Sequence, residues 1–502
     1  MSSWSRYRRL VGAELFKLRT VRRWVIVLIA LIPLTAGFAL LLSSTFKYSP
    51  GGLPPIVGPH GLAVQDQFRF MHQPMTGDGS ITVHVTEQHL PPQEREIIRD
   101  NGEVVVPVLQ DRAGAGIMIK SAAQAGAAYA AIMVTPHAGV LMSSNFGDDI
   151  TGPAATSPQW LRLDRTGPTV TGYTSEDGAA WTKVATVSVP QLPATAQVGL
   201  FASSPDETKL EKSLGSTSLG LRPTQSVATF DNLKVPGSVA GEWVSDDIGS
   251  VDRSGESPEK GNGPQGSTRA LDGTYTLQGS GTFRTNLMPD DPVEGALIPL
   301  FFGLMLLIPI AVLFITTEHK RPLLKLTFAA SPHRGTVIAA KATVIAVTGF
   351  VLGTVAALVS YSVSMPRMRA NGYAPPNFQT VSLGDIDVWR AIVGSGALFA
   401  GIAVLALGLG AIMRHSAAAI ATTIALVIVP MFIGTPLPLA AARWLMYLTP
   451  AGGFAMQRTL PPDPTLAVPS SMIWPWQGLA AVAGYAILAT VIGIRLTRKR
   501  DA

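Results

Sequence analysis

The chain has 502 residues, a charged fraction of 14%, a formal net charge of +6 and no cysteine. The length exceeds that of one ordinary domain, and the charged fraction lies well below the roughly 25% of soluble proteins. The lack of cysteine excludes disulfides, thiolate metal sites and cysteine nucleophiles, and because the basic residues cluster beside hydrophobic segments, the positive charge does not indicate nucleic-acid binding.

Six hydrophobic segments approach the ~20 residues that a helix needs to cross a bilayer. They are 24–46, 293–317, 336–363, 390–413, 416–437 and 475–495. The first follows a long basic segment and exceeds the about 7–15 residues of a signal-peptide core, so it predicts an uncleaved transmembrane helix. A short apolar stretch after Pro438 predicts a re-entrant or outward-facing half-helix.

Lysine and arginine residues indicate the orientation, since they concentrate on the cytoplasmic side of membrane proteins. They gather in residues 1–23, in the loop after the second span, at Arg414 and from Arg495 onward. Both termini are therefore predicted to be cytoplasmic, with residues 47–292 outside the cell. Apolar residues at helical spacing from Trp4 to Leu18 predict that 1–23 form an interfacial amphipathic helix, although a simple charged anchor also fits.

The spans carry essentially no ionisable residue in their middles. Intramembrane charge usually marks a proton or ion path, so its absence argues against an ion-driven transporter. Lys341 lies in the first two turns of the third span, where it is expected to reach back to the cytoplasmic surface.

Residues 47–292 alternate between short apolar strands and turn signals, which predicts an all-β sandwich with a linker. Asp-Gly and related pairs predict hairpins at Gly77-Asp78-Gly79, Thr166-Gly167 and Asp177-Gly178. Further strands are expected at Gly116–Lys120, Tyr129–Val134, Gly139–Met142, Val198–Ala202, Ala228–Val235, Tyr275–Leu277 and Thr282–Thr285, and a loose loop near 250–270.

The β region lacks a clear catalytic pattern. Glu94 and Glu96 sit in a polar loop rather than on a strand with the carboxylate spacing of glycosidases. Trp160 and Trp181 are candidates for stacking on a ligand, although buried core aromatics are the commoner use of such residues. Calcium at the aspartates Asp148, Asp149 or Asp231 is a weaker alternative, and the eight histidines show no metal spacing.

Three stretches around the third span carry a family resemblance: Thr317-Glu318-His319-Lys320-Arg321-Pro322, Leu326–Arg334 and Ala339-Ala340-Lys341. Together with Ala13–Arg19 they resemble the type-2 ABC-transporter permeases, although His319 and Pro322 stand where that family usually has Tyr and Gly. The resemblance covers 1–46 and 293–502. In addition, stretches such as Trp160–Leu163, Trp181–Val184 and Phe230–Leu233 resemble the concanavalin-A-like jelly roll.

The resemblance implies six transmembrane helices with a jelly-roll-like extracellular domain inserted between the first two. It also implies that the cytoplasmic loop 318–335 couples the helices to an ATP-hydrolysing subunit. The matching residues are Glu318, His319, Lys320, Arg321, Pro332, Arg334 and Lys341. Glu318 and Arg334 are expected to expose charge to that partner. No phosphate-binding loop occurs in the chain, so ATP and Mg would be held by the partner subunit.

The sequence therefore predicts a non-enzymatic permease subunit of an exporter in a bacterial-type plasma membrane, paired with a second permease copy as a homodimer or heterodimer. The lack of ionisable residues in the middles of the spans favours a hydrophobic or amphipathic cargo such as a drug, lipid or peptide. The main alternative is a membrane-anchored extracellular glycan-binding or sensor protein, in which the β domain is the working part.

Overall fold

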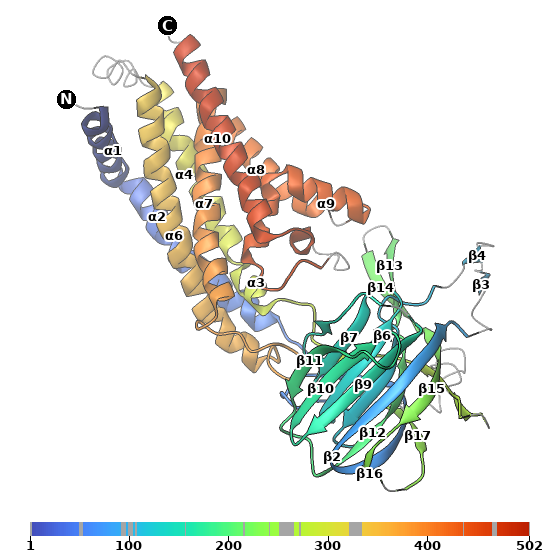
Figure 1. The fold of residues 1–502 in the computed structure, drawn as a ribbon. Helices are drawn as coiled ribbons and strands as arrows, with labels where there is room; N and C mark the ends of the chain where they lie inside the picture. Colours follow the sequence, from blue (N-terminus) through green and yellow to red (C-terminus); the bar gives the residue numbers. More distant parts are fainter. Residues whose placement is uncertain are drawn as a thin grey trace.

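The structure is a computed structural model of the chain. It describes residues 3–49, 54–91, 97–98, 104–105, 108–155, 157–213, 216–239, 241–249, 266–270, 273–320, 334–434, 436–463 and 469–500. The described residues form a helical part and a separate β domain, which lies at one end of the helices (Figure 1).

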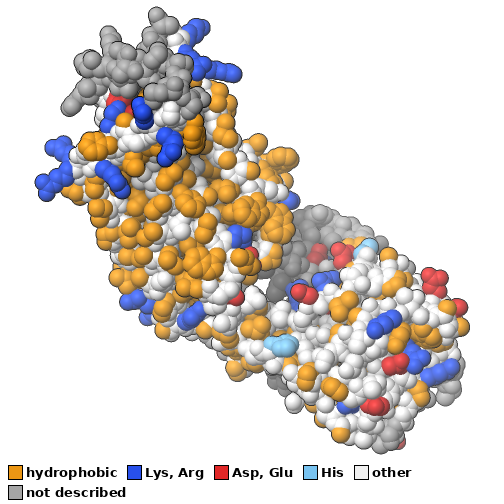
Figure 2. Space-filling model, turned by 60° about the vertical axis from the view of Figure 1, so that its left-hand side comes forward, with side chains coloured by type: hydrophobic (Ala, Val, Ile, Leu, Met, Phe, Trp, Pro, Cys, Tyr) orange, Lys and Arg blue, Asp and Glu red, His pale blue; other side chains and the backbone are white. Residues whose placement is uncertain are grey.

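Within these ranges, six helices are long and apolar enough to cross a membrane, as the sequence predicted. They are α2 (Arg22–Thr45), α4 (Leu300–Lys320), α6 (Arg334–Ala370), α7 (Ile386–Met413), α8 (Ser416–Gly434) and α10 (Pro475–Arg500). Hydrophobic side chains cover the visible face of this helical part, with Lys and Arg side chains toward both of its ends (Figure 2).

Helix α7 lies at the centre of the helical part and packs against α6, α4, α8 and α10. Glycine permits its closest approach to α6, because a Cβ on Gly396 would lie 2.1 Å from Thr354 Oγ1 and one on Gly353 would lie 2.7 Å from Phe399. On the other side, a Cβ on Gly408 would lie 2.8 Å from Ala489 of α10. Small residues of this kind let apolar helices pack closely without a hydrophobic driving force between them.

The described residues of this part also contain five shorter helices: α1 (Ser3–Thr20), α3 (Pro292–Leu297), α9 (Leu439–Leu448) and the 3-10 helices η3 (Pro450–Gln457) and η4 (Pro469–Met472). The second predicted span is thus two helices, because Pro299 has no N–H to continue α3 into α4. Helix α9 occupies the stretch where a half-helix was expected, and its Trp444 and Leu448 are exposed.

The β domain is inserted between α2 and α3. Among the described residues, its first ten strands are β1 (Val64–Asp66), β2 (Phe68–His89), β3 (Ile97–Ile98), β4 (Val104–Val105), β5 (Gly114–Lys120), β6 (Tyr129–Thr135), β7 (Gly139–Ser144), β8 (Ile150–Thr151), β9 (Gln159–Thr166) and β10 (Thr169–Ser175). The remainder are β11 (Thr182–Ser188), β12 (Thr195–Ser203), β13 (Glu207–Ser213), β14 (Ser216–Arg222), β15 (Gln225–Lys234), β16 (Gly237–Val239), β17 (Val244–Ile248), β18 (Gly266–Arg269), β19 (Tyr275–Ser280) and β20 (Phe283–Thr285).

Fourteen of these strands form one hydrogen-bonded sheet that folds into two packed layers. One layer contains β12, β5, β6, β7 and β8, and the other contains β15, β19, β9, β10 and β11. The apolar side chains between them are buried and include Ile117, Ile132, Val83, Leu161 and Leu277. This alternation of inward apolar residues is the pattern from which the sequence predicted the strands.

The predicted hairpins at Thr166-Gly167 and Asp177-Gly178 are present, joining β9 to β10 and β10 to β11. The predicted hairpin at Gly77-Asp78-Gly79 is wrong, because β2 continues through it from Phe68 to His89. Its first half pairs with β12 and its second half with β9 and β15, so β2 belongs to both layers. Gly77 takes a positive φ of 75° inside the strand, where it permits a change of direction without a reversal.

The two ends of the β domain meet in a small antiparallel pair, β1 with β20. Beneath this pair lies a second apolar cluster on the outer side of the β5–β7 layer, which includes Phe68, Tyr129, Phe146, Phe201 and Phe283. The strands entering from α2 and leaving toward α3 are therefore fixed to each other and to the domain.

Candidate functional site

The candidate site is a ring of four charged side chains that we call the loop-end cluster: Glu14 and Lys17 of α1, Glu318 of α4 and Lys341 of α6. Lys341 Nζ lies 2.6 Å from Glu14 Oε2 and 2.8 Å from Glu318 Oε1. Lys17 Nζ lies 3.0 Å from Glu14 Oε1 and 3.2 Å from Glu318 Oε1. Each lysine thus contacts both carboxylates, and the formal charges balance.

The ring is graded from buried to exposed. The side chains of Lys341 and Glu14 are 1% and 2% exposed, Glu318 is 12% exposed and Lys17 is 41% exposed. The Lys341 ammonium also lies 4.5 Å from the centre of the Phe314 ring, a cation–π contact. Burial lowers the pKa of Lys17, but its hydrogen bonds with Glu14 and Glu318 and their charges raise it by more, so the net shift is upward.

Sequence position explains why these residues meet. Lys17 follows Glu14 by one helical turn, so both project from the same face of α1. Glu318 lies in the last turn of α4, where a carboxylate faces the negative end of the helix dipole and gains from a cation nearby. Tyr7, which lies two turns before Glu14, forms a 2.6 Å hydrogen bond with Thr343 of α6 and fixes α1 along that helix.

The seven predicted coupling residues divide into three groups. Glu318 and Lys341 belong to the loop-end cluster. His319 and Lys320 form the last residues of α4, and Arg334 begins α6. Arg321 and Pro332 lie outside the described residues. The cluster therefore stands at the two helix ends from which the chain enters and leaves segment 321–333.

Two expectations about these residues need correction. Glu318 does not expose its charge to a partner, because its Oε1 contacts both lysines and little of the side chain reaches solvent. Lys341 does not reach back to the surface, because it pairs with the carboxylate of Glu14, which is buried as deeply as Lys341 itself. The residues that sequence reasoning missed are Glu14 and Lys17, whose signal was an acid and a base one turn apart on an otherwise amphipathic helix.

A second set of polar side chains, the linker-end cluster, stands where the β domain returns to the helices. It comprises Asp291, Glu294, Arg458, Thr459 and Ser470. Asp291 Oδ1 caps α3 by accepting from Val293 N at 2.9 Å, and its Oδ2 accepts from Leu460 N at 3.0 Å and from the N–H and hydroxyl of Thr459.

Glu294 completes the linker-end cluster. Its Oε2 lies 3.1 Å from Arg458 Nη1, and its Oε1 accepts a hydrogen bond from Ser470. Burial raises the pKa of Glu294, against the opposing effects of Ser470 and Arg458. These contacts bind α3 to the segment between α9 and α10. A movement of β20, the last strand before α3, would therefore reach the helices at the linker-end cluster.

The two tryptophans proposed for ligand stacking already have protein neighbours. Trp160 stacks on the His84 ring, with ring centres 4.8 Å apart, and a Cβ on Gly178 would lie 2.8 Å from its indole. The Arg162 guanidinium lies 6.0 Å from the centre of the Trp181 ring. Among the described residues, no group of three His, Asp or Glu side chains could hold a metal ion.

No family model and no curated protein match the sequence. Among solved structures, scytalido-glutamic peptidase with a transition-state analogue inhibitor is 8% identical, with 44% of this chain and 100% of that chain covered at a TM-score of 0.25. SCP-B, of the eqolisin family of peptidases, in complex with a tripeptide, is 7% identical, with 43% of this chain and 98% of that chain covered at a TM-score of 0.23. At such scores these likenesses carry no argument about this chain.

Proposed function

We propose that this chain is the membrane-spanning permease subunit of an ATP-driven ABC exporter. The six apolar helices would cross a bacterial-type plasma membrane with both termini cytoplasmic, and the β domain would stand outside as a jelly-roll-like sandwich. ATP and Mg would be bound by a separate subunit, and a second permease copy would complete the pathway. The observation that carries the proposal is the loop-end cluster at both ends of segment 321–333.

The cluster suits a coupling role because it connects three helices at one point. A partner that pushes on segment 321–333 would displace the ends of α4 and α6 together. The four charges would move as a group, since separating Lys341 would leave the buried Glu14 with only the partly exposed Lys17 as its counter-charge in the cluster. The displacement would then reach α1 through Glu14 and Lys17. In this way, a push on one loop would rearrange the six-helix bundle.

The cargo in this proposal is hydrophobic or amphipathic: a drug, a lipid or a peptide. The six helices are strongly apolar along their described lengths, which suits such a cargo better than a charged solute. The proposal would fail on this point if the cargo bound to the purified complex proved to be strongly charged and hydrophilic.

The alternative is a membrane-anchored extracellular sensor or glycan-binding protein. A pocket in the β domain, described below, favours the sensor form. The glycan-binding form receives less support, because the Trp160 and Trp181 rings pack on protein neighbours. Removing the β domain separates the two ideas: a sensor loses its function, whereas a permease keeps its coupling to an ATPase.

The test is gentle purification from native membranes, followed by identification of the co-purified chains and an ATPase assay. We expect a stoichiometric ATP-binding subunit. Lys320→Ala and Arg334→Ala should weaken its retention roughly tenfold, as expected for charged contacts at an interface. Arg367→Ala, an exposed charge at the other end of α6, is the matched control. Isolation of the chain without any ATP-binding subunit would contradict the proposal.

A further inference from the structure

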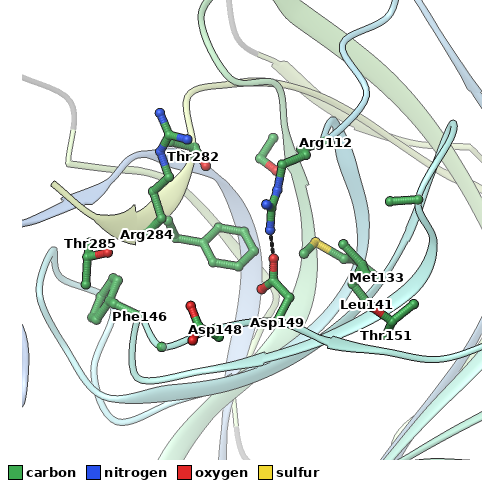
Figure 3. A pocket seen from close by; sticks show the side chains of 14 residues that line it. Arg112, Met133, Leu141, Phe146, Asp148, Asp149, Thr151, Thr282, Arg284 and Thr285 are labelled. Carbon is green, nitrogen blue, oxygen red and sulfur yellow. Dashed lines mark ion pairs between the residues drawn. The ribbon is translucent and has the colours of Figure 1, made fainter. Parts of the chain in front are cut away.

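The β domain contains a pocket of about 460 Å³ beside β20 (Figure 3). Its floor is apolar and formed by Met133, Leu141, Phe146 and Phe283, each at most 7% exposed. These side chains belong to the second apolar cluster, which lies beneath the β1–β20 pair. The pocket therefore offers an apolar surface that the packing of the domain holds in place.

The wall of the pocket carries two arginines and two aspartates. Arg112 and Asp149 face each other as an ion pair (Figure 3). Asp148 and Arg284 also line the pocket, and both are exposed. Neither makes an ion pair or a side-chain hydrogen bond with another residue in the described part of the chain. One acidic and one basic group are thus available to a ligand, while the four formal charges sum to zero.

The pocket also runs along the backbone of β20, since residues 282–285 all line it. Thr282 O accepts a hydrogen bond from Gln67 N at 2.9 Å, and Asn286 N donates to Ala63 O at 2.8 Å. Hydrogen-bonded pairs alternate along an antiparallel pair, so the N–H groups of Phe283 and Thr285 point away from β1. An extended peptide can add to a strand edge of this kind.

We propose that this pocket binds a short peptide with apolar side chains and free termini. Asp148 would receive the ammonium and Arg284 the carboxylate, while an apolar side chain covers the floor of Met133, Leu141, Phe146 and Phe283. Because the four charges of the pocket wall sum to zero, the pocket disfavours a purely anionic or cationic ligand. The free edge of β20 favours a peptide over other zwitterions. This site goes beyond the proposed permease function, because binding depends on the β domain alone.

The experiment is isothermal titration of the purified full-length protein in nanodiscs with trileucine. We expect saturable binding. Asp148→Asn and Arg284→Gln should each weaken it about tenfold or more, as for the loss of a charge-assisted hydrogen bond. Trileucine with an acetylated N-terminus and an amidated C-terminus should lose a similar factor. Glu176→Gln and Lys234→Gln, exposed β-domain charges outside the pocket lining, are the matched controls.

A further variant blocks the pocket sterically. Thr151 lines the pocket and is exposed, so Thr151→Trp should abolish binding without lowering the Tm. Absence of saturable binding by the wild-type protein would overturn the proposal. So would equal binding of the blocked peptide or unchanged binding by the Asp148 and Arg284 variants. Because no ATPase subunit takes part, such a failure would leave the permease proposal standing.

Discussion

The loop-end and linker-end clusters hold the ends of the helical part by different means. The loop-end cluster pairs charges with charges, since each carboxylate contacts two lysines. The linker-end cluster satisfies its acids chiefly with N–H groups and hydroxyls, together with one arginine. The first depends on an exact balance of charge, whereas the second depends on hydrogen-bond geometry. Substitutions that remove a charge should therefore separate them.

The largest effect is expected from Lys341→Met. This variant leaves Glu14 buried, with the partly exposed Lys17 as its remaining partner in the cluster, so we expect a loss of about 3–5 kcal/mol in the free energy of unfolding. A large fall in Tm in detergent would report it. Arg367→Met, an exposed charge on the same helix, is the control. Adding Glu14→Gln to Lys341→Met should recover part of the loss. If Lys341→Met alone proved as stable as Arg367→Met, the idea that the cluster depends on balanced charge would be contradicted.

The next largest effect is expected from Asp291→Ala. The variant removes the cap of α3 and leaves the N–H groups of Thr459 and Leu460 without their acceptor, which should cost about 2–3 kcal/mol. Asp291→Asn keeps an oxygen acceptor and should lose less. Asp290→Ala changes the exposed neighbour and should have little effect. Chemical or thermal unfolding of the four proteins would check this order, and equal losses at positions 290 and 291 would contradict it.

The sequence predicted the helices well, because their apolar lengths are a local property. Local patterns also identified β5, β6, β9 and β10. The error at Gly77-Asp78-Gly79 arose because an Asp-Gly pair predicts a reversal only when the flanking strands pair with each other. Here the first half of β2 pairs with β12 and the second with β9 and β15, and these partners are distant in the sequence.

The two clusters show the same limit of prediction from sequence, because their members come from distant parts of the chain. Glu318 and Lys341 were recognised from a family pattern, but the second carboxylate that contacts Lys341, that of Glu14, lies 327 residues away, on α1. Only the packing of α1 against α6 brings them together. Asp291 and Glu294 form an acid pair just before an apolar run, a recognisable helix-start signal. Their partner Arg458 lies beyond α4, α6, α7, α8, α9 and η3, in a loop without any pattern of its own.

The linker-end cluster should also give the protein a pH dependence through Glu294. Burial raises the pKa of this carboxyl above its usual value of 4.5, so folding favours the protonated form. Its contribution to stability is then fully present below that usual value and is lost as the pH rises through the folded pKa. Glu294→Gln should remove the contribution of this carboxyl to the change of Tm with pH between about pH 4 and about pH 8. An unchanged slope would show that other groups cause it.

The smallest effect is expected from Lys17→Ala, which tests whether the loop-end cluster is graded by depth. Lys17 contacts the same two carboxylates as Lys341 but is 41% exposed, and exposed ion pairs contribute only about 0.2–1 kcal/mol. The raised pKa of Lys17 means that its contribution is complete below the usual value of 10.5 and is lost only as the pH rises through the folded pKa. Added salt should shrink the Tm difference between wild type and Lys17→Ala but leave that of Lys341→Met nearly unchanged. If both variants responded equally to salt, the two lysines would share one environment, and the charge balance would not depend on burial.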